Sequence, residues 1–151
     1  MNGIPEGFRR ARIPAPFVEA SGPFYWRDEA GALVLGFRVE NRHTNTAGNL
    51  HGGMLMTLVD MQLNCALNYQ LDIEAFIPTV AANIDFLAPA TTGDWVEGRT
   101  EILRSGGRTV FADGRIMRGD GELIARCSGI FKLSRANGNE GAIFDPRAAF
   151  S

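Results

Sequence analysis

The groups with the clearest chemical capacity lie between Asn45 and Asp60. A polar loop ends there in His51-Gly52-Gly53, and a long apolar stretch without proline follows. Two glycines at the start of a helix leave its first backbone N–H groups unshielded by side chains. Together with the positive end of the helix dipole, those donors suit a substrate oxygen that gains negative charge during a reaction. The same pair of glycines is also typical of an ordinary tight turn.

Asp60 supplies a carboxylate inside the predicted helix, residues 52–69. That stretch is rich in Leu, Met and Ala and apolar on nearly every side, as in a buried helix. A carboxylate there costs on the order of several kcal/mol unless it is paired or hydrated. No Lys or Arg lies on the helix, so either core amides and hydroxyls bind Asp60 or it faces a pocket and takes part in a reaction. A narrow polar stripe at helical spacing contains it: Thr57, Asp60, Asn64 and Asn68.

The two histidines and two cysteines give no metal pattern. His51 can cap the helix, orient the loop or act in catalysis, and we expect it to support the site, whereas His43 is predicted to be a solvated loop residue. A metal site built from His43, His51 and Asp60 matches no common zinc spacing, so no metal is predicted. Cys65 and Cys127 lie far apart in apolar segments and are expected to be reduced and buried.

Most other predicted elements are strands. Two are expected at 24–26 and 33–39, with the polar tract 27–31 as their turn. After Pro78 the apolar period changes to two, which predicts four antiparallel strands, at 80–86, 96–102, 109–117 and 123–133. A curved antiparallel sheet wrapped around one long central helix accommodates every element, which is an α+β fold. Because such a sheet covers only part of the helix, a second copy of the chain is expected to cover the rest.

Length and charge limit the classes of protein to consider. The chain has 151 residues, is 45% hydrophobic and carries a formal net charge of -2. This suits one domain, residues 16–134, between an N-terminal arm, 1–15, and a loosely ordered tail, 135–151. No long basic run favours nucleic acid or a membrane surface. Without a signal peptide or a span of ~20 apolar residues, a soluble, cytoplasmic protein is expected.

The spacing of Gly52 and Asp60 predicts a site made by two subunits. They are eight residues apart, which is about 12 Å along one helix at ~1.5 Å per residue. One substrate carbonyl cannot contact both. Two antiparallel helices related by a two-fold axis would place Gly52 of one copy near Asp60 of the other. If both residues are catalytic, the active site is shared.

The string His51-Gly52-Gly53, with Asp60 nine residues after the histidine, resembles the hotdog-fold thioesterase superfamily. The likeness is greatest to its phenylacetate-pathway and 4-hydroxybenzoyl-CoA-type branch, and covers roughly residues 30–133, including 86–90. The resemblance implies a hotdog fold and an acyl-CoA thioesterase. It also implies a homodimer with shared active sites that pairs into a dimer of dimers. Coenzyme A would enter as part of the substrate, and no other cofactor is expected.

The resemblance also implies a role for each site residue. Asn45 resembles the loop amide that helps to hold the thioester, and the Gly52 N–H resembles the donor that polarises its carbonyl. Asp60 resembles the carboxylate that either attacks the carbonyl or activates water, a choice that one sequence leaves open. Thr79 resembles the hydroxyl that positions this water. His51, from its place at the helix start, is expected to orient the site. The coenzyme A-binding residues stay unassigned.

Two other functions remain open on the sequence. A hotdog dehydratase or hydratase would need a histidine and an acid facing the acyl chain, and the second partner is not obvious here. A non-catalytic acyl-CoA sensor would not need Asp60 at a thioester carbonyl. The sequence does not name the acyl group. Several arginines can meet the phosphates of coenzyme A or be solvated: Arg9, Arg10, Arg12, Arg104 and Arg108.

Overall fold

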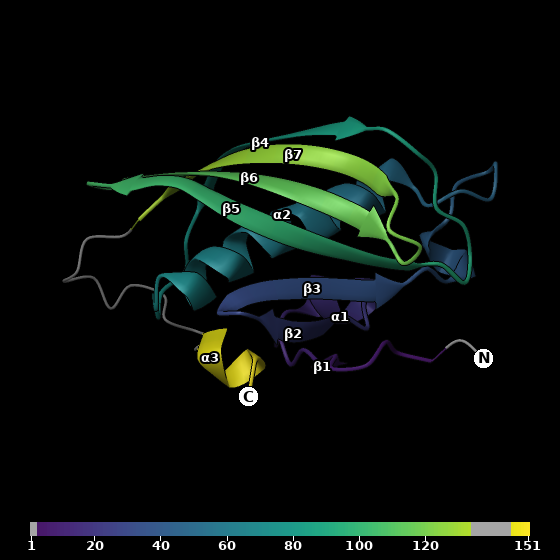
Figure 1. Cartoon of the computed structure of the whole chain (residues 1–151), viewed down its shortest axis with the longest axis horizontal. Coiled ribbons are helices and arrows are strands. Elements are labelled where there is room, and N and C mark those ends of the chain that lie inside the picture. The colour runs from purple at the N-terminus through teal and green to yellow at the C-terminus, as the bar shows by residue number, and fades with distance from the viewer. Residues whose placement is uncertain (1–2, 134–145) are drawn as a thin grey trace.

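The computed structural model describes residues 3–133 and 146–151. Within them, seven strands form one antiparallel sheet that curls around the long helix α2, Gly52–Gln70 (Figure 1). The strands are β1 Arg9–Arg10, β2 Tyr25–Glu29, β3 Ala32–Arg38, β4 Thr79–Phe86, β5 Trp95–Gly106, β6 Thr109–Arg118 and β7 Leu123–Lys132, in the spatial order β1-β2-β3-β5-β6-β7-β4. The shorter helices are α1 Pro16–Ser21, α3 Pro146–Ala149 and the 3₁₀ turn Asn41–His43. The predicted fold class is confirmed.

The apolar side of α2 packs against the inner face of the sheet and forms the core. Leu63 of α2 is fully buried between the central strands. A Cβ on Gly114 or Gly129 would lie 3.2 or 2.9 Å from the Leu63 side chain, and even closer to Cys127 or Phe131. These glycines therefore let the helix approach the strands closely. Among the described residues no helix is long and apolar enough to cross a membrane.

The first hairpin is longer than the sequence predicted. The tract 27–31 is not the turn, because Arg27 and Asp28 pair with Val34 and Leu33 in the sheet. The chain reverses at Ala30 and Gly31, which have φ values of 54° and 84°. Asp28 accepts the Gly31 N–H at 3.0 Å, so local turn chemistry sets the bend, and a charged strand residue is tolerated because β2 is solvent-facing there.

Both chain ends pack on the first hairpin. β1 pairs with β2, so part of the expected arm adds a strand to the sheet. The Phe150 ring is buried and lies edge-on to Trp26, with 5.4 Å between ring centroids. The loose order expected for 135–151 is therefore wrong for 146–151, because Phe150 has an apolar surface to cover. Residues 134–145 lie outside the described residues.

Candidate functional site

Capping by His51 leaves one backbone donor available at the start of α2. The His51 Nδ1 accepts the Gly53 N–H at 2.8 Å. The His51 carbonyl oxygen accepts the Met54 and Leu55 N–H groups, both at 3.0 Å. The Gly52 N–H has no acceptor among the described residues. It can therefore donate to a ligand at the positive end of the helix dipole.

An apolar groove of about 400 Å³ lies beside this donor. Gly52 forms part of its wall, together with Leu50, Leu55, Phe86 and Ile124. A Cβ at Gly52 would lie 3.2 Å from Cζ of the Phe86 ring. The absence of a side chain thus keeps the approach from the groove to the Gly52 N–H open.

Asn45 shapes the loop that leads to His51. Its Oδ1 accepts the N–H groups of Ala47 and Asn49, at 2.9 and 3.2 Å. The carbonyl oxygen of the side chain is therefore occupied by its own loop, while the exposed amide NH₂ has no partner within the described part of the chain. Only this NH₂ group can contribute to the thioester binding that the resemblance implies for Asn45.

His43 is not solvated, contrary to the prediction, but 5% exposed. Its Nδ1 accepts the Glu40 N–H at 3.0 Å, and its Nε2 lies 3.0 Å from the Ser21 carbonyl oxygen. Burial, and then the charge of Arg42, lower the pKa of His43. The ring is thus neutral at neutral pH and donates through Nε2. Its role is structural: it ties the end of α1 to the loop before α2.

Asp60 and Thr79 meet although they are far apart in the sequence. Thr79, the first residue of β4, donates its hydroxyl to Asp60 Oδ1 at 2.8 Å. Both residues are exposed in the single chain. Asp60 is therefore not buried in one chain, although the apolar residues around it on α2 are typical of a buried helix. The carboxylate is hydrated in one copy and keeps Oδ2 available for a reaction.

The polar stripe of α2 holds the segment that carries Thr79. Asn64 Nδ2 donates to the Ile77 carbonyl oxygen at 2.6 Å. Asn68 Nδ2 donates to the carbonyl oxygens of Ile73 and Ala75, at 2.8 and 2.9 Å. These bonds fix the turn between α2 and β4. Both asparagines belong to the polar stripe seen in the sequence, but their role in holding this turn was not predicted. The helical spacing of the stripe was the only signal that could have suggested it.

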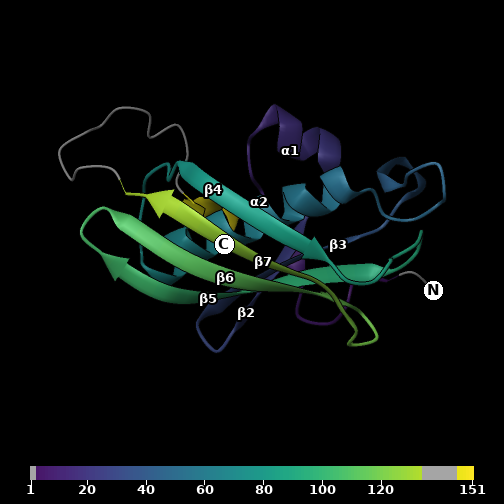
Figure 2. The same ribbon diagram turned by 90° about the horizontal axis from the view of Figure 1, so that it is seen from above.

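One chain does not bring Gly52 and Asp60 together. They lie on the same α-helix, two turns apart, at the separation of about 12 Å expected from ~1.5 Å per residue. Figure 2 shows β4 along the edge of the sheet, beside α2. Within the described residues β4 pairs only with β7, and Val80 and Phe86 are 63% and 57% exposed. The edge of β4 is thus open, carries apolar side chains and lies beside the Asp60 carboxylate. A second chain can cover such a surface.

The remaining candidate groups fit no metal or thiol chemistry. The described residues contain no cluster of three or more side chains that could bind a metal ion. Cys65 and Cys127 are free and buried, as expected. Burial, and then the charge of Asp60, raise the pKa of the Cys65 thiol to about 12. A thiol with that pKa is protonated and unreactive at neutral pH.

Comparisons with known proteins show the family of this chain. The family model described as the thioesterase superfamily matches residues 47–125. A Pseudomonas aeruginosa protein named as an esterase is 36% identical over 134 residues, which are 88% of this chain and 99% of that protein. Mouse acyl-coenzyme A thioesterase 13 is 35% identical over 97 residues, 62% of this chain and 67% of that one.

A solved structure matches the fold. The Escherichia coli PaaI protein, from the phenylacetic acid degradation operon, superimposes with a TM-score of 0.72 at 24% identity, over 81% of this chain and 86% of that one. The chain belongs to the thioesterase superfamily, and the resemblance seen in its sequence is confirmed. It is a thioester hydrolase.

Proposed function

We propose that this thioesterase hydrolyses acyl-coenzyme A to the free acid and coenzyme A. The observation that carries the proposal is the Gly52 N–H, which has no acceptor within the described chain and lies beside an apolar groove. A thioester carbonyl needs such a donor, and an acyl group needs such a groove. The name of the mouse relative supports coenzyme A as the thiol.

The reaction that these groups support is attack on a polarised carbonyl. The Gly52 N–H stabilises the negative charge that develops on the carbonyl oxygen. Asp60 either attacks the carbonyl carbon or removes a proton from a water that attacks it. In the first route the C–S bond breaks, coenzyme A leaves as a thiolate, and water then opens the resulting mixed anhydride. In the second route the tetrahedral intermediate expels the same thiolate, and in both the thiolate takes up a proton to give coenzyme A. The Thr79 hydroxyl hydrogen is donated to Asp60 Oδ1, so its oxygen can accept a hydrogen bond from that water. Asn45 and His51 support the loop and the helix start, and no metal or other cofactor is required.

The active site in this proposal is shared in a homodimer. Gly52 and Asp60 are separated along α2, while the β4 edge beside Asp60 and Thr79 is open. An antiparallel pair of α2 helices would bring the Gly52 groove of one subunit to the Asp60–Thr79 pair of the other. The free thiols of both cysteines suit a reducing compartment, so we place this activity in the cytoplasm.

His51 gives a reason to prefer hydrolysis over dehydration or hydration. Its Nδ1 accepts the Gly53 N–H and so caps the helix. A dehydratase histidine must face the acyl chain and exchange a proton with it, whereas His51 does not line the apolar groove beside Gly52.

Thiol release from a panel of acyl-coenzyme A substrates tests the proposal. Purified protein should hydrolyse at least one aromatic or medium-to-long acyl-coenzyme A, and Asp60→Asn should serve as the inactive control. Binding of several panel members without any thiol release would favour the sensor function. Formation or loss of an α,β double bond, followed by absorbance, would favour the dehydratase.

A further inference from the structure

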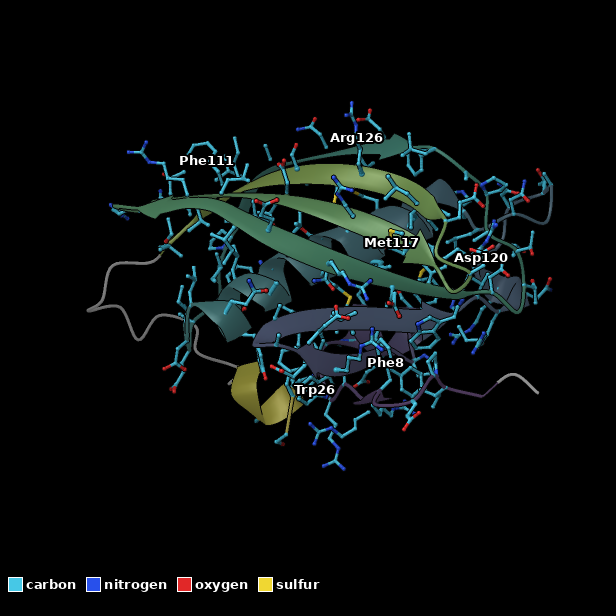
Figure 3. All side chains as sticks on the ribbon, in the orientation of Figure 1. Phe8, Trp26, Phe111, Met117, Asp120 and Arg126 are labelled. Carbon is cyan, nitrogen blue, oxygen red and sulfur yellow. The ribbon has the colours of Figure 1, made fainter. Side chains whose placement is uncertain are left out.

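A basic groove crosses the outer face of the sheet, on the side opposite to α2. Its volume is about 900 Å³, a size that suits a small organic molecule. Arg115 and Met117 line it from β6, where they flank the buried Ile116 and therefore point away from α2. In Figure 3, Met117 and Asp120 lie on the β6 side of β5, and Phe8 lies on the β3 side.

The lining of the basic groove carries more positive than negative charge. Five arginines and three acidic residues line it: Arg27, Arg38, Arg99, Arg115, Arg118, Asp94, Glu97 and Asp120. This excess of positive charge contrasts with the net charge of -2 for the whole chain. A concave surface lined mainly by one sign of charge concentrates ions of the opposite sign.

Acidic side chains neutralise three of the five arginines. Glu97 pairs with Arg27 and Arg99, at 3.5 and 2.9 Å. Asp120 pairs with Arg118 at 2.7 Å. Because these charges already have partners within the chain, the other two arginines determine what the basic groove can bind.

Arg38 and Arg115 have no acidic partner among the described residues. Asp94, the third acidic residue of the lining, accepts two hydrogen bonds from its own turn, at 2.8 and 3.3 Å. Arg38 donates to the carbonyl oxygens of Gly93, at 2.9 Å, and of Gly3, and its Nε is buried without a partner within the described chain. The Arg115 side chain is exposed and forms no hydrogen bond in the part that the structure describes. Both positive charges are therefore available to attract an anion.

The surroundings of Arg115 favour a phosphate group. Arg115 lies directly opposite Arg99 of β5 and Arg126 of β7, so three guanidinium groups share one face of the sheet. Like charges placed directly opposite one another destabilise a sheet, and an anion beside them offsets this cost. A phosphate carries about two negative charges and three acceptor oxygens, which guanidinium groups bind in pairs. Glu101 and Asp113, farther along the strands, line a neighbouring hollow and not the basic groove.

From this arrangement we infer that the basic groove binds a phosphorylated small molecule, with its phosphate at Arg115 and the rest along Met117 toward Arg38. The site is distinct from the candidate active site, because no residue assigned to the reaction lines it. The loop between β4 and β5 separates the two cavities, since Pro89 lines the apolar groove beside α2 and Gly93 lines the basic groove. The inference does not depend on the thioesterase reaction.

Pyrophosphate is the first probe, because it carries the phosphate charge without the rest of a ligand. The chain has two tryptophans, and their indole N–H signals in a nitrogen-edited NMR spectrum report on binding to the wild-type protein. Trp95 lines the basic groove and donates to Glu97 at 2.8 Å, so its signal should shift saturably, with a Kd of about 1 mM or lower. Trp26 is buried and does not line the groove, so its signal should stay in place.

Arg115→Gln should weaken pyrophosphate binding by about tenfold or more, the scale of a lost charge-assisted hydrogen bond. Its fold should be intact, as circular dichroism can verify, because the side chain has no partner to lose. Arg104→Gln is the matched control, because it removes the same charge from an exposed residue of β5 outside the groove. It should leave the affinity unchanged. A Trp95 signal that does not shift, or equal losses of affinity in the two variants, would overturn the inference.

The kinetics of Arg115→Gln distinguish a separate ligand from the phosphates of the proposed substrate. If the ligand is separate, KM and kcat for the best acyl-coenzyme A should be those of the wild type, while pyrophosphate binding is lost. A KM that rises in parallel with the loss of pyrophosphate binding would show that the groove holds the coenzyme A phosphates. That result would overturn the inference of a separate site.

Discussion

The two halves of the candidate site differ in what a single chain provides. At the start of α2, one chain supplies a finished half-site: a cap, an available Gly52 N–H and an adjoining apolar groove. Two turns later, Asp60 and Thr79 form a hydrogen-bonded pair that is exposed. The half that binds the carbonyl has a groove of its own chain beside it, and the half that supplies the carboxylate has none. This difference favours an active site that a second copy of the chain completes.

Replacing Asp60 should have the largest effect. Asp60→Asn preserves the shape and the hydrogen bond that Thr79 donates, but removes the charge needed for attack or proton removal. Turnover of the best acyl-coenzyme A should fall by about 10² or more, the scale of general acid–base catalysis, with the circular dichroism spectrum unchanged. Turnover near that of the wild type would exclude Asp60 from the chemical step.

Mixing two inactive variants measures directly whether the halves belong to one site. Gly52→Val blocks the carbonyl-binding half by placing methyl groups at the Phe86 ring, and Asp60→Asn removes the other half. In a mixed dimer, one site then carries both changes and the other is wild type. Random pairing makes half of the dimers mixed, so about a quarter of wild-type activity should return, by two-fold symmetry.

Mass spectrometry must first verify that mixed dimers have formed after co-expression or refolding. As the matched control, the same mixing of Asp60→Asn with Thr79→Ala should give no more activity than the mean of the two parents, because both changes lie in the same half-site and every mixed site keeps one of them. Verified mixed dimers of the first pair that stay as inactive as their parents would exclude the shared site, while the thioesterase assignment would stand.

Thr79 should affect the chemical step more than substrate binding. Thr79→Ala removes the hydrogen bond to Asp60 Oδ1 and the oxygen that can hold the water, so kcat should fall by about tenfold, the scale of a hydrogen bond to a charged group. KM should change little, and Thr79→Ser should retain most activity. A change confined to KM would instead place Thr79 in substrate binding.

The sequence could predict what depends on local patterns, but not what depends on contacts between distant segments. The spacing of apolar residues was enough for α2 and the strands around it, because period and length are local properties. The His51-Gly52-Gly53 start and the distance to Asp60 were also visible. The burial of His43 and the exposure of Asp60 were not visible in the sequence, because each depends on which distant segment packs against the residue. The resemblance alone assigned Asp60 and Thr79 to one site, and the hydrogen bond between them was not predicted, since it requires the turn between α2 and β4 to fold back on the helix.

The smallest predicted effect concerns the asparagines that hold this turn. Asn64 binds the Ile77 carbonyl oxygen at 2.6 Å, two residues before Thr79. Asn64→Leu should therefore displace the Thr79 hydroxyl from Asp60 and lower kcat by roughly threefold to tenfold, with KM nearly unchanged. The effect should vanish in a Thr79→Ala background, because Asn64 acts only by positioning that hydroxyl, and coupled residues are not additive.

Asn68→Leu is the control that separates positioning from stability. Asn68 is more buried than Asn64 and holds two carbonyl oxygens farther from Thr79. Losing two hydrogen bonds and leaving the carbonyl oxygens of Ile73 and Ala75 without their donor should lower Tm more than Asn64→Leu does. Its kcat should nevertheless fall less, because the Ile77 bond next to Thr79 is intact. If kcat instead follows Tm across both variants, the asparagines only stabilise the fold, and the Asp60–Thr79 pair needs no further support from α2.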